Sequence, residues 1–251
     1  MLDVIGALVF GAINMAFLVV LIGLAAIRPA SKFLAFAIAG TWISLIVTIA
    51  ALGGFGPGIA GPFPTPVIAF LVVVVAGLTA WLVWPAFRRA VFSIPLVALV
   101  GINGVRVAGV FFLILHAQGR LAASFSTSAG WGDILAGAIA IPVAALLTWK
   151  GTAPRWLLGS WNALGILDLI TAIALGALSA PGTPFQVFTE APGTRAMGTL
   201  PWVMIPAILV PLFLLTHLAI ALRLRAPYTV RVRTDQRNSE LPREAAVGRV
   251  A

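Results

Sequence analysis

The chain has 251 residues, of which 61% are hydrophobic and only 9% are charged, against roughly 25% charged residues in a soluble domain. Together with a mean hydropathy of +1.09, this excludes a soluble enzyme, a nucleic-acid-binding protein and a disordered chain. The net charge is +9, and the absence of cysteine excludes disulfides and thiolate metal sites. The composition therefore indicates a polytopic membrane protein.

Seven apolar stretches are long enough to cross a hydrocarbon core of about 30 Å, which needs about 20 residues per helix. Helices are expected because backbone groups in lipid must be paired within their own segment. The predicted spans are residues 4–27, 33–54, 66–87, 91–117, 129–149, 156–180 and 200–222. The predicted fold class is an all-α bundle of seven transmembrane helices over residues 1–225. Residues 226–251 are predicted to form a basic, disordered cytoplasmic tail.

The positions of Lys and Arg predict the orientation of the bundle. Thirteen of the sixteen fall in the tail or in loops on one side of the predicted membrane, while only Arg120 and Arg195 fall on the other side. Cytoplasmic loops carry an excess of Lys and Arg. The N-terminus is therefore predicted to lie outside and the C-terminus in the cytoplasm.

Ionisable side chains within spans are costly and usually face the protein interior. Arg106 and Asp168 both fall about midway along predicted spans, and they are the one cation and the one anion expected at that depth. The sequence therefore predicts a pair. It is interpreted either as a site for an ion, a proton or a small polar molecule, lined also by Asn103, Asn14 and Ser44, or as a buried bridge that fixes helix register.

A second acidic residue, Asp133, falls in the first turn of the predicted fifth span. A carboxylate there stabilises the positive end of the helix dipole. The alternative hypothesis is an outward-facing site that Asp133 shares with His116, Gln118 and Arg120.

The chain offers few groups for cofactor or catalytic chemistry. Its two histidines, His116 and His217, fall near opposite ends of predicted spans, so they cannot both bind one haem iron. A haem with a single histidine ligand, or a pigment, stays as an alternative. No cofactor, metal site or complete catalytic set is predicted, so an enzyme is not favoured.

Several short motifs resemble a signature of uncharacterised bacterial multi-span proteins. They are Arg-x-x-Gly from Arg106, Gln-Gly-x-Leu from Gln118, Ala-Gly-x-Gly-Asp ending at Asp133, and the Trp161, Asn162 and Asp168 of the sixth span. In that pattern a proline usually follows the leucine, whereas Ala122 stands here. The resemblance implies a seven-helix fold and a bacterial inner membrane, and it implies no activity.

Three functional hypotheses follow. The first is a membrane protein that handles a small molecule, an ion or a proton through Arg106 and Asp168. The second is a non-catalytic accessory or assembly subunit of a larger membrane complex. The third is a membrane enzyme acting on lipid or isoprenoid, or a pigment or haem binder. The expected partners are membrane lipids and other membrane subunits or further copies of the chain, without nucleic acid.

Overall fold

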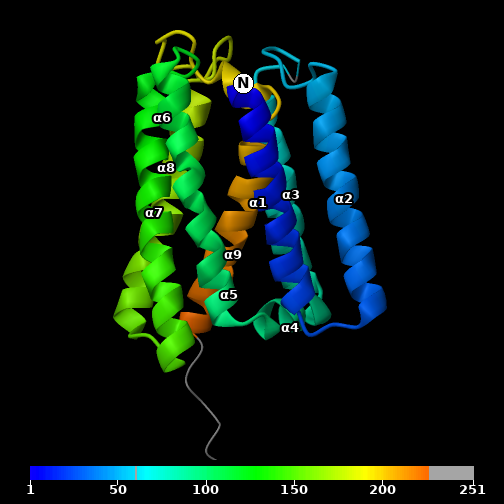
Figure 1. Cartoon of the computed structure of the whole chain (residues 1–251). Helices are drawn as coiled ribbons and strands as arrows, with labels where there is room; N and C mark the ends of the chain where they lie inside the picture. Colours follow the sequence, from blue (N-terminus) through cyan, green and yellow to red (C-terminus); the bar gives the residue numbers. More distant parts are fainter. Residues whose placement is uncertain (60, 226–251) are drawn as a thin grey trace, which may run out of the picture.

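Seven long helices form one bundle in the computed structural model, which describes residues 1–59 and 61–225 (Figure 1). The tail predicted over residues 226–251 lies outside the described residues. Each of the seven is long and apolar enough to cross a membrane, and the described part of the chain contains no strand. The prediction of an all-α, seven-helix membrane protein is confirmed. The spans are α1 (Leu2–Leu24), α2 (Pro29–Ala51), α3 (Thr65–Val83), Leu96–Ala117, α7 (Ala123–Lys150), α8 (Arg155–Leu178) and Ile205–Arg225.

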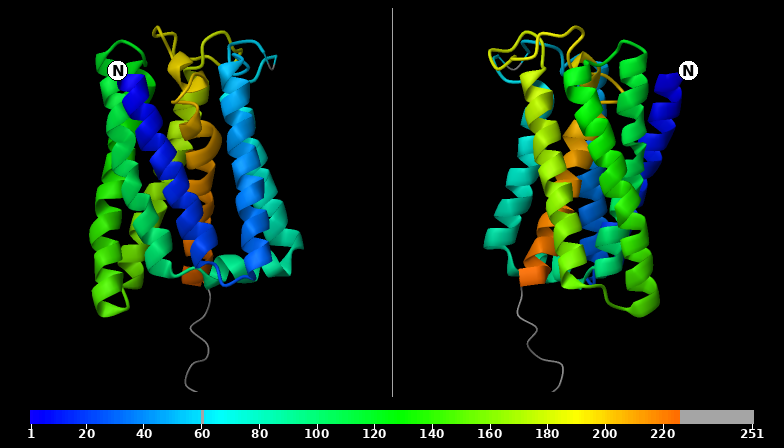
Figure 2. Two further views of the ribbon diagram at one scale, coloured as in Figure 1. Left: turned by 45° about the vertical axis from the view of Figure 1, so that its right-hand side comes forward. Right: turned by 90° about the vertical axis from the view of Figure 1, so that its left-hand side faces the viewer.

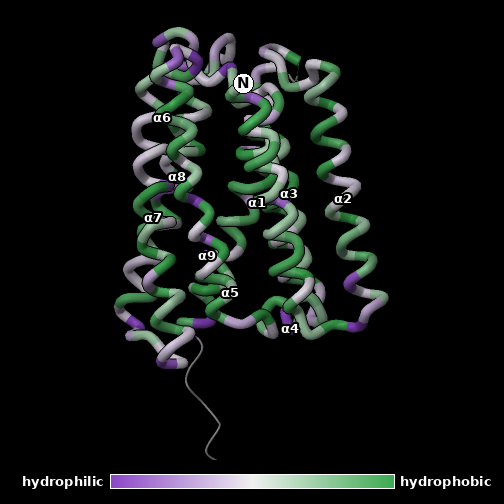
Figure 3. The backbone as a smooth tube through the Cα atoms, in the orientation of Figure 1, coloured by the Kyte–Doolittle hydropathy of each residue, from purple (hydrophilic) through white to green (hydrophobic). Residues whose placement is uncertain are grey.

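The two ends of the bundle differ in charge. Met1 and the segments 52–59, 61–64, 118–122 and 179–204 gather at one end, which we call the N-terminal end (Figure 2). The opposite end, which we call the basic end, holds Arg28, Lys32, Arg88, Arg89, Lys150, Arg155, Arg223 and Arg225. Between the two ends most of the chain is apolar, and a small group of hydrophilic segments lies about halfway along the bundle (Figure 3).

A short helix, α4 (Pro85–Ser93), lies across the basic end (Figure 1). The predicted third span is therefore too long, because α3 ends at Val83. Pro85 explains the break: a residue before proline avoids the helical region, and Trp84 has φ −119° and ψ 95°. The end of α4 is held by hydrogen bonds from Ala26 N to Ser93 Oγ (2.8 Å) and from Arg223 to the Val91 carbonyl (2.6 Å).

The fourth span is wound unevenly. It begins with α5 (Leu96–Gly101), continues as the 3₁₀ helix η1 (Ile102–Gly109) and ends as α6 (Val110–Ala117). A 3₁₀ helix has three residues per turn, so side chains at i and i+3 eclipse one another. Asn103, Arg106 and Gly109 follow this spacing and are all buried. The tighter winding thus aligns Arg106 with its neighbours on one inward face.

Two further helices begin at positions that differ from the sequence-based prediction. The last span starts at Ile205 with the π-helical segment η3 (Ile205–Leu209), which continues into α9 (Val210–Arg225). The 3₁₀ turn η2 (Arg195–Gly198) precedes it in the chain. Helix α7 starts at Ala123 rather than at residue 129. Asp133 is therefore in the third turn of α7, and the expectation that it stabilises the positive end of the helix dipole from the first turn is wrong.

The cap of α7 comes from a distant loop. The carboxylate of Glu190 accepts hydrogen bonds from the backbone N–H groups of Ala123 (3.0 Å) and Ser124 (3.2 Å). These are among the first four N–H groups, which have no partner within a helix. Ala122, at the N-cap, has no side-chain acceptor to offer, so the loop 179–204 is tied to the start of α7.

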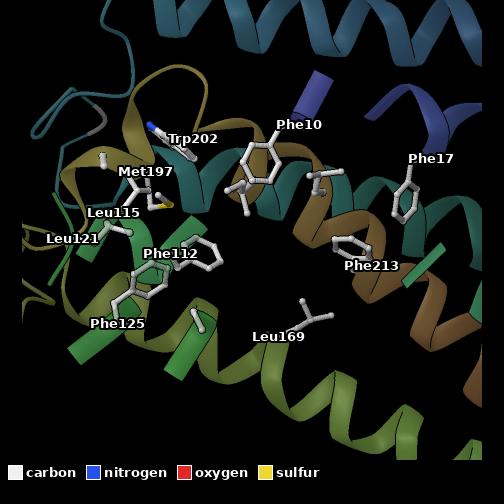
Figure 4. Packing of buried hydrophobic residues seen from close by; sticks show 14 of the residues in the cluster. Phe10, Phe17, Phe112, Leu115, Leu121, Phe125, Leu169, Met197, Trp202 and Phe213 are labelled. Atoms are coloured by element: carbon white, nitrogen blue, oxygen red, sulfur yellow. The ribbon is translucent and has the colours of Figure 1, made fainter. Parts of the chain in front are cut away.

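Aromatic side chains form much of the core in the N-terminal half of the bundle (Figure 4). The rings of Phe17 and Phe213 lie 5.0 Å apart in an edge-on arrangement, and Phe10 meets Trp202 at 5.8 Å in the same way. Such edge-to-face pairs add about 0.5–1.5 kcal/mol beyond the area they bury. Helix α1 is thereby joined to the last span. By contrast, Ile46 is the one fully buried residue of α2.

Candidate functional site

Arg106 is the centre of a buried polar cluster halfway along the bundle. Its Nε donates to Asp133 Oδ1 at 2.7 Å, one terminal nitrogen donates to Asp168 Oδ2, and the other lies 3.1 Å from His217 Nε2. These partners belong to α7, α8 and α9, so one side chain of η1 binds three other helices. We call Arg106, Asp133, Asp168 and His217 the Arg106 cluster.

Glycines make the room that the cluster occupies. A Cβ atom at Gly109 would lie 2.5 Å from the Cβ of Asp133, and one at Gly137 would lie 2.7 Å from the backbone nitrogen of Val107 beside Arg106. A Cβ at Gly132 would overlap the carboxylate of Asp168. Small residues let membrane helices approach closely. Here they bring η1, α7 and α8 close enough for their polar side chains to meet.

The ring of His217 is held from both sides. A guanidinium can only donate hydrogen bonds, so His217 Nε2 accepts from Arg106 and the ring proton is on Nδ1. Nδ1 then donates to Asn162 Oδ1, which lies 2.9 Å away. The ring is therefore neutral, with one defined tautomer. It is fully buried and packs against Trp161 with ring centroids 5.0 Å apart.

The cluster is buried, but not uniformly. The side chain of Arg106 is fully buried, whereas Asp168 keeps 8% and Asp133 keeps 16% of its side-chain exposure. One guanidinium faces two carboxylates, so the cluster carries one uncompensated negative charge when both acids are ionised. Asp133 is the member most accessible from outside the cluster.

The exposed part of Asp133 faces two cavities. The large cavity has a volume of about 330 Å³ and extends from the loops at the N-terminal end down to Asp133, between α3, α8 and the last span. The second, which Arg106 and Phe213 also line, has a volume of about 20 Å³, enough for about one water molecule. Asp133 thus connects the cluster to a space that a ligand can occupy.

The structure brings together some of the predicted site residues. Arg106 and Asp168 form the predicted pair. Asn103 is buried one 3₁₀ turn away, but it donates to the Leu99 carbonyl (2.9 Å) and to Thr216 Oγ1 (3.5 Å) rather than to a carboxylate. Asn103 is therefore next to the predicted pair, but its amide faces α9 rather than the carboxylates.

Two other predicted lining residues lie away from the cluster. Asn14 is buried on α1 and donates to the Phe10 carbonyl at 2.7 Å. Ser44 is exposed on α2, so its assignment to the site is wrong. The reason is that α2 stands at the margin of the bundle, where matching depth does not bring a side chain to the centre (Figure 1).

The structure does not bring Asp133 to the other residues of the predicted outer-face group. His116 Nδ1 lies 3.0 Å from the Leu121 carbonyl, and Gln118 is exposed in the turn after α6. Arg120 binds Asp3 of α1 at 2.8 Å. Asp133 lies ten residues into α7, about 15 Å along the helix at about 1.5 Å per residue, and so meets Arg106 instead.

Asp133 and His217 are the two members that sequence reasoning did not place in the cluster. Counted from Ile205, His217 lies about 18 Å along its span, close to the depth of Asp133 and Asp168. The position was missed because the span was predicted to begin at residue 200. For Asp133 a signal existed: Gly130 to Asp133 and Gly165 to Asp168 share the pattern Gly-x-x-Asp.

The hydrogen bonds of the Arg106 cluster determine which of its atoms can take part in chemistry. Both ring nitrogens of His217 are engaged by Arg106 and Asn162, so neither is free for an iron atom. Across residues 1–59 and 61–225, no three His, Asp or Glu side chains are grouped so that they could hold a metal ion. Two carboxylates beside one fixed cation can instead exchange a proton.

Comparison with known proteins places the chain in a family. No curated protein and no solved structure matches it. A family model described as a domain of unknown function, DUF8737, matches residues 63–225. This range holds the whole Arg106 cluster and leaves α1 and α2 outside. Since the match covers more than half of the sequence, the chain belongs to the DUF8737 family.

Proposed function

We propose that this multi-pass membrane protein binds and moves a proton, or a small cation that replaces it, through the Arg106 cluster. The observation that carries the proposal is the ratio of charges: Asp133 and Asp168 both bond to the single guanidinium of Arg106. Ionisable groups inside a membrane bundle commonly mark ion or proton pathways. One bound proton, or one monovalent cation, makes this cluster neutral.

Burial strengthens this charge argument. An uncompensated charge taken out of water costs several kcal/mol, so the cluster is most stable when a positive charge is added. A salt bridge that only fixes the register of the helices needs no more than Arg106 and one acidic residue. The second acid gives the site a capacity to gain and lose one positive charge.

The neighbours of the cluster fix its geometry while this charge changes. Asn162 and Trp161 hold the ring of His217, and Trp161 is itself bound through its Nε1 to the Ala136 carbonyl at 2.9 Å. His217 therefore fixes the position of the Arg106 guanidinium on the side that faces away from Asp133 and Asp168. The exchangeable charge is carried by Asp133 and Asp168, of which Asp133 faces the cavities.

We place the basic end of the bundle in the cytoplasm, following the excess of Lys and Arg there. The large cavity then opens toward the outer face, and Asp133 is reached from outside. We infer a bacterial cytoplasmic membrane from the motif resemblance of the sequence.

Proton flux into liposomes tests the proposal. The purified protein is reconstituted with a pH-sensitive dye inside, and a potassium diffusion potential drives the flux. Wild-type protein should give a dye response above that of empty liposomes, and Asp133→Asn and Asp168→Asn should each reduce it at least about tenfold. The same assay with sodium present on one side distinguishes a proton from a replacing cation.

Asp3→Asn is the matched control. Asp3 is also paired with an arginine, Arg120, but it lies at the N-terminal end with half of its side chain exposed, so flux should be unchanged. Unfolding followed by tryptophan fluorescence confirms that each variant is folded. Equal flux in wild-type and Asp168→Asn liposomes would overturn the proposal and leave the cluster as a structural bridge.

A further inference from the structure

The large cavity is lined mostly by apolar side chains and has Asp133 at its inner end. Its volume of about 330 Å³ lies in the range of about 300–1,000 Å³ that small-molecule sites occupy. The walls are mostly apolar side chains from α3, α6, α7, α8 and the last span, among them Phe70, Phe112, Phe125, Leu169, Ala172 and Val210. Such walls suit an apolar molecular body.

The polar groups of the cavity are concentrated at its two ends. Among the described residues, Asp133 is the one acidic lining residue and lies at the inner end. Arg195, the one basic lining residue of the same part of the chain, is exposed among the loops at the N-terminal end. Water screens a charge at the loop end. The inner end lies among apolar side chains, where a charge acts through a lower dielectric.

Asp133 has bonding capacity left for a ligand. A carboxylate has about four acceptor positions, and among the described residues Asp133 uses Oδ1 for Arg106. Its remaining exposure is toward the cavities. The charge it presents is negative, because Arg106 is shared with Asp168.

We propose that the large cavity binds an amphiphilic organic monocation: an apolar body of roughly the size of an eight-carbon chain or a substituted aromatic ring, with one ammonium group directed at Asp133. The apolar body contacts the cavity walls, and the positive charge completes the charge balance of the Arg106 cluster. This inference rests on the proposed function, because the charge that selects the ligand is the one that the proposed function assigns to the cluster.

The same charge balance makes the cation and the proton alternatives. With a proton bound, the cluster is neutral and has no net charge to attract an ammonium group. When the cation binds, the proton on the carboxylate leaves to water and the cluster returns to neutrality with the cation in its place. Binding of one cation therefore releases about one proton.

Octyltrimethylammonium is the probe, because its charge does not titrate and any released proton must come from the protein. Its binding to the protein in nanodiscs is measured by equilibrium dialysis against empty nanodiscs, and proton release is followed in weakly buffered solution. Octanol and octanoate are the neutral and anionic comparisons. Wild-type protein should bind the cation at least about tenfold more tightly than either one, with about one proton released per cation.

Three variants locate the binding. Asp133→Asn should lose the preference for the cation and the proton release while still binding octanol. Val67→Phe narrows the cavity from α3, which contributes no residue to the Arg106 cluster, and should weaken both probes. Asp3→Asn is the charge-matched control and should bind as wild type does. If a variant fails to fold, the preference of wild-type protein for the cation over octanol and octanoate still tests the proposal.

The outcomes separate the two proposals. Equal binding of octanol, octanoate and the cation, or cation binding that survives Asp133→Asn, would overturn this inference even if the liposome flux is present. Cation binding that depends on Asp133 but releases no proton, in a protein without proton flux, would uphold the site and refute the proton-handling function.

Discussion

At the scale of single residues, Gly132 shows how closely the cluster is fitted. A methyl group there would overlap the carboxylate of Asp168, which is bound to Arg106. The substitution Gly132→Ala should therefore displace Asp168 and destabilise the protein by about 1–3 kcal/mol, the usual cost of overpacking. The measurement is the unfolding temperature in detergent, followed by intrinsic tryptophan fluorescence.

Gly159→Ala is the matched control for that substitution. Gly159 lies on α8, as does Asp168, but a Cβ there would meet nothing within 4 Å. Alanine loses less conformational freedom than glycine in a helix, so this variant should unfold at the wild-type temperature or above. If both alanine variants behave alike, Gly132 has no special role in the packing of the cluster.

At the scale of elements, Glu190 links a loop to the start of α7. Its hydrogen bonds from the Ala123 and Ser124 N–H groups stabilise the charged carboxylate, so its pKa lies below its ordinary value of 4.5. A group with a depressed folded pKa stabilises the fold above its ordinary pKa, and that contribution is lost as the pH falls through the folded value. Acid should therefore weaken the attachment of the loop.

The substitution Glu190→Gln tests this link. The unfolding temperature of wild-type protein should fall between about pH 6 and about pH 3, which brackets the ordinary range of glutamate. The unfolding temperature of the variant should be lower than that of wild type at about pH 6. It should fall less on acidification, because residue 190 then has no carboxylate to protonate. An equal loss in both proteins would mean that these hydrogen bonds do not contribute to stability.

The number of spans follows from apolar length alone, and charge balance is enough to pair Arg106 with Asp168. The predicted starts of the fourth, fifth and seventh spans differ from the observed ones by five, six and five residues, about 8–9 Å along a helix. The errors in the fifth and seventh spans moved Asp133 and His217 away from the cluster. The cap from Glu190 joins residues 66 positions apart, which no local pattern records.

At the scale of the whole molecule, orientation in the membrane can be measured cleanly. The chain has no cysteine, so a single introduced cysteine is the one thiol to react. We expect Gln118→Cys, exposed at the N-terminal end, to react with a membrane-impermeant maleimide added to intact cells, and Lys150→Cys, exposed at the basic end, to react only after lysis. The reverse pattern would place the large cavity on the cytoplasmic side.

The three-way binding of Arg106 also has a mechanical consequence. Its contacts to α7, α8 and α9 make one guanidinium the joint of four spans. A force that draws α9 out of the membrane breaks the contact with His217, yet the two carboxylates still hold η1, α7 and α8 together. Helix α2 has one fully buried residue and is joined to other spans by single hydrogen bonds, such as that from Trp42 Nε1 to the Ala207 carbonyl (3.3 Å). A pulling force should therefore extract α2 before it separates the four spans that Arg106 joins.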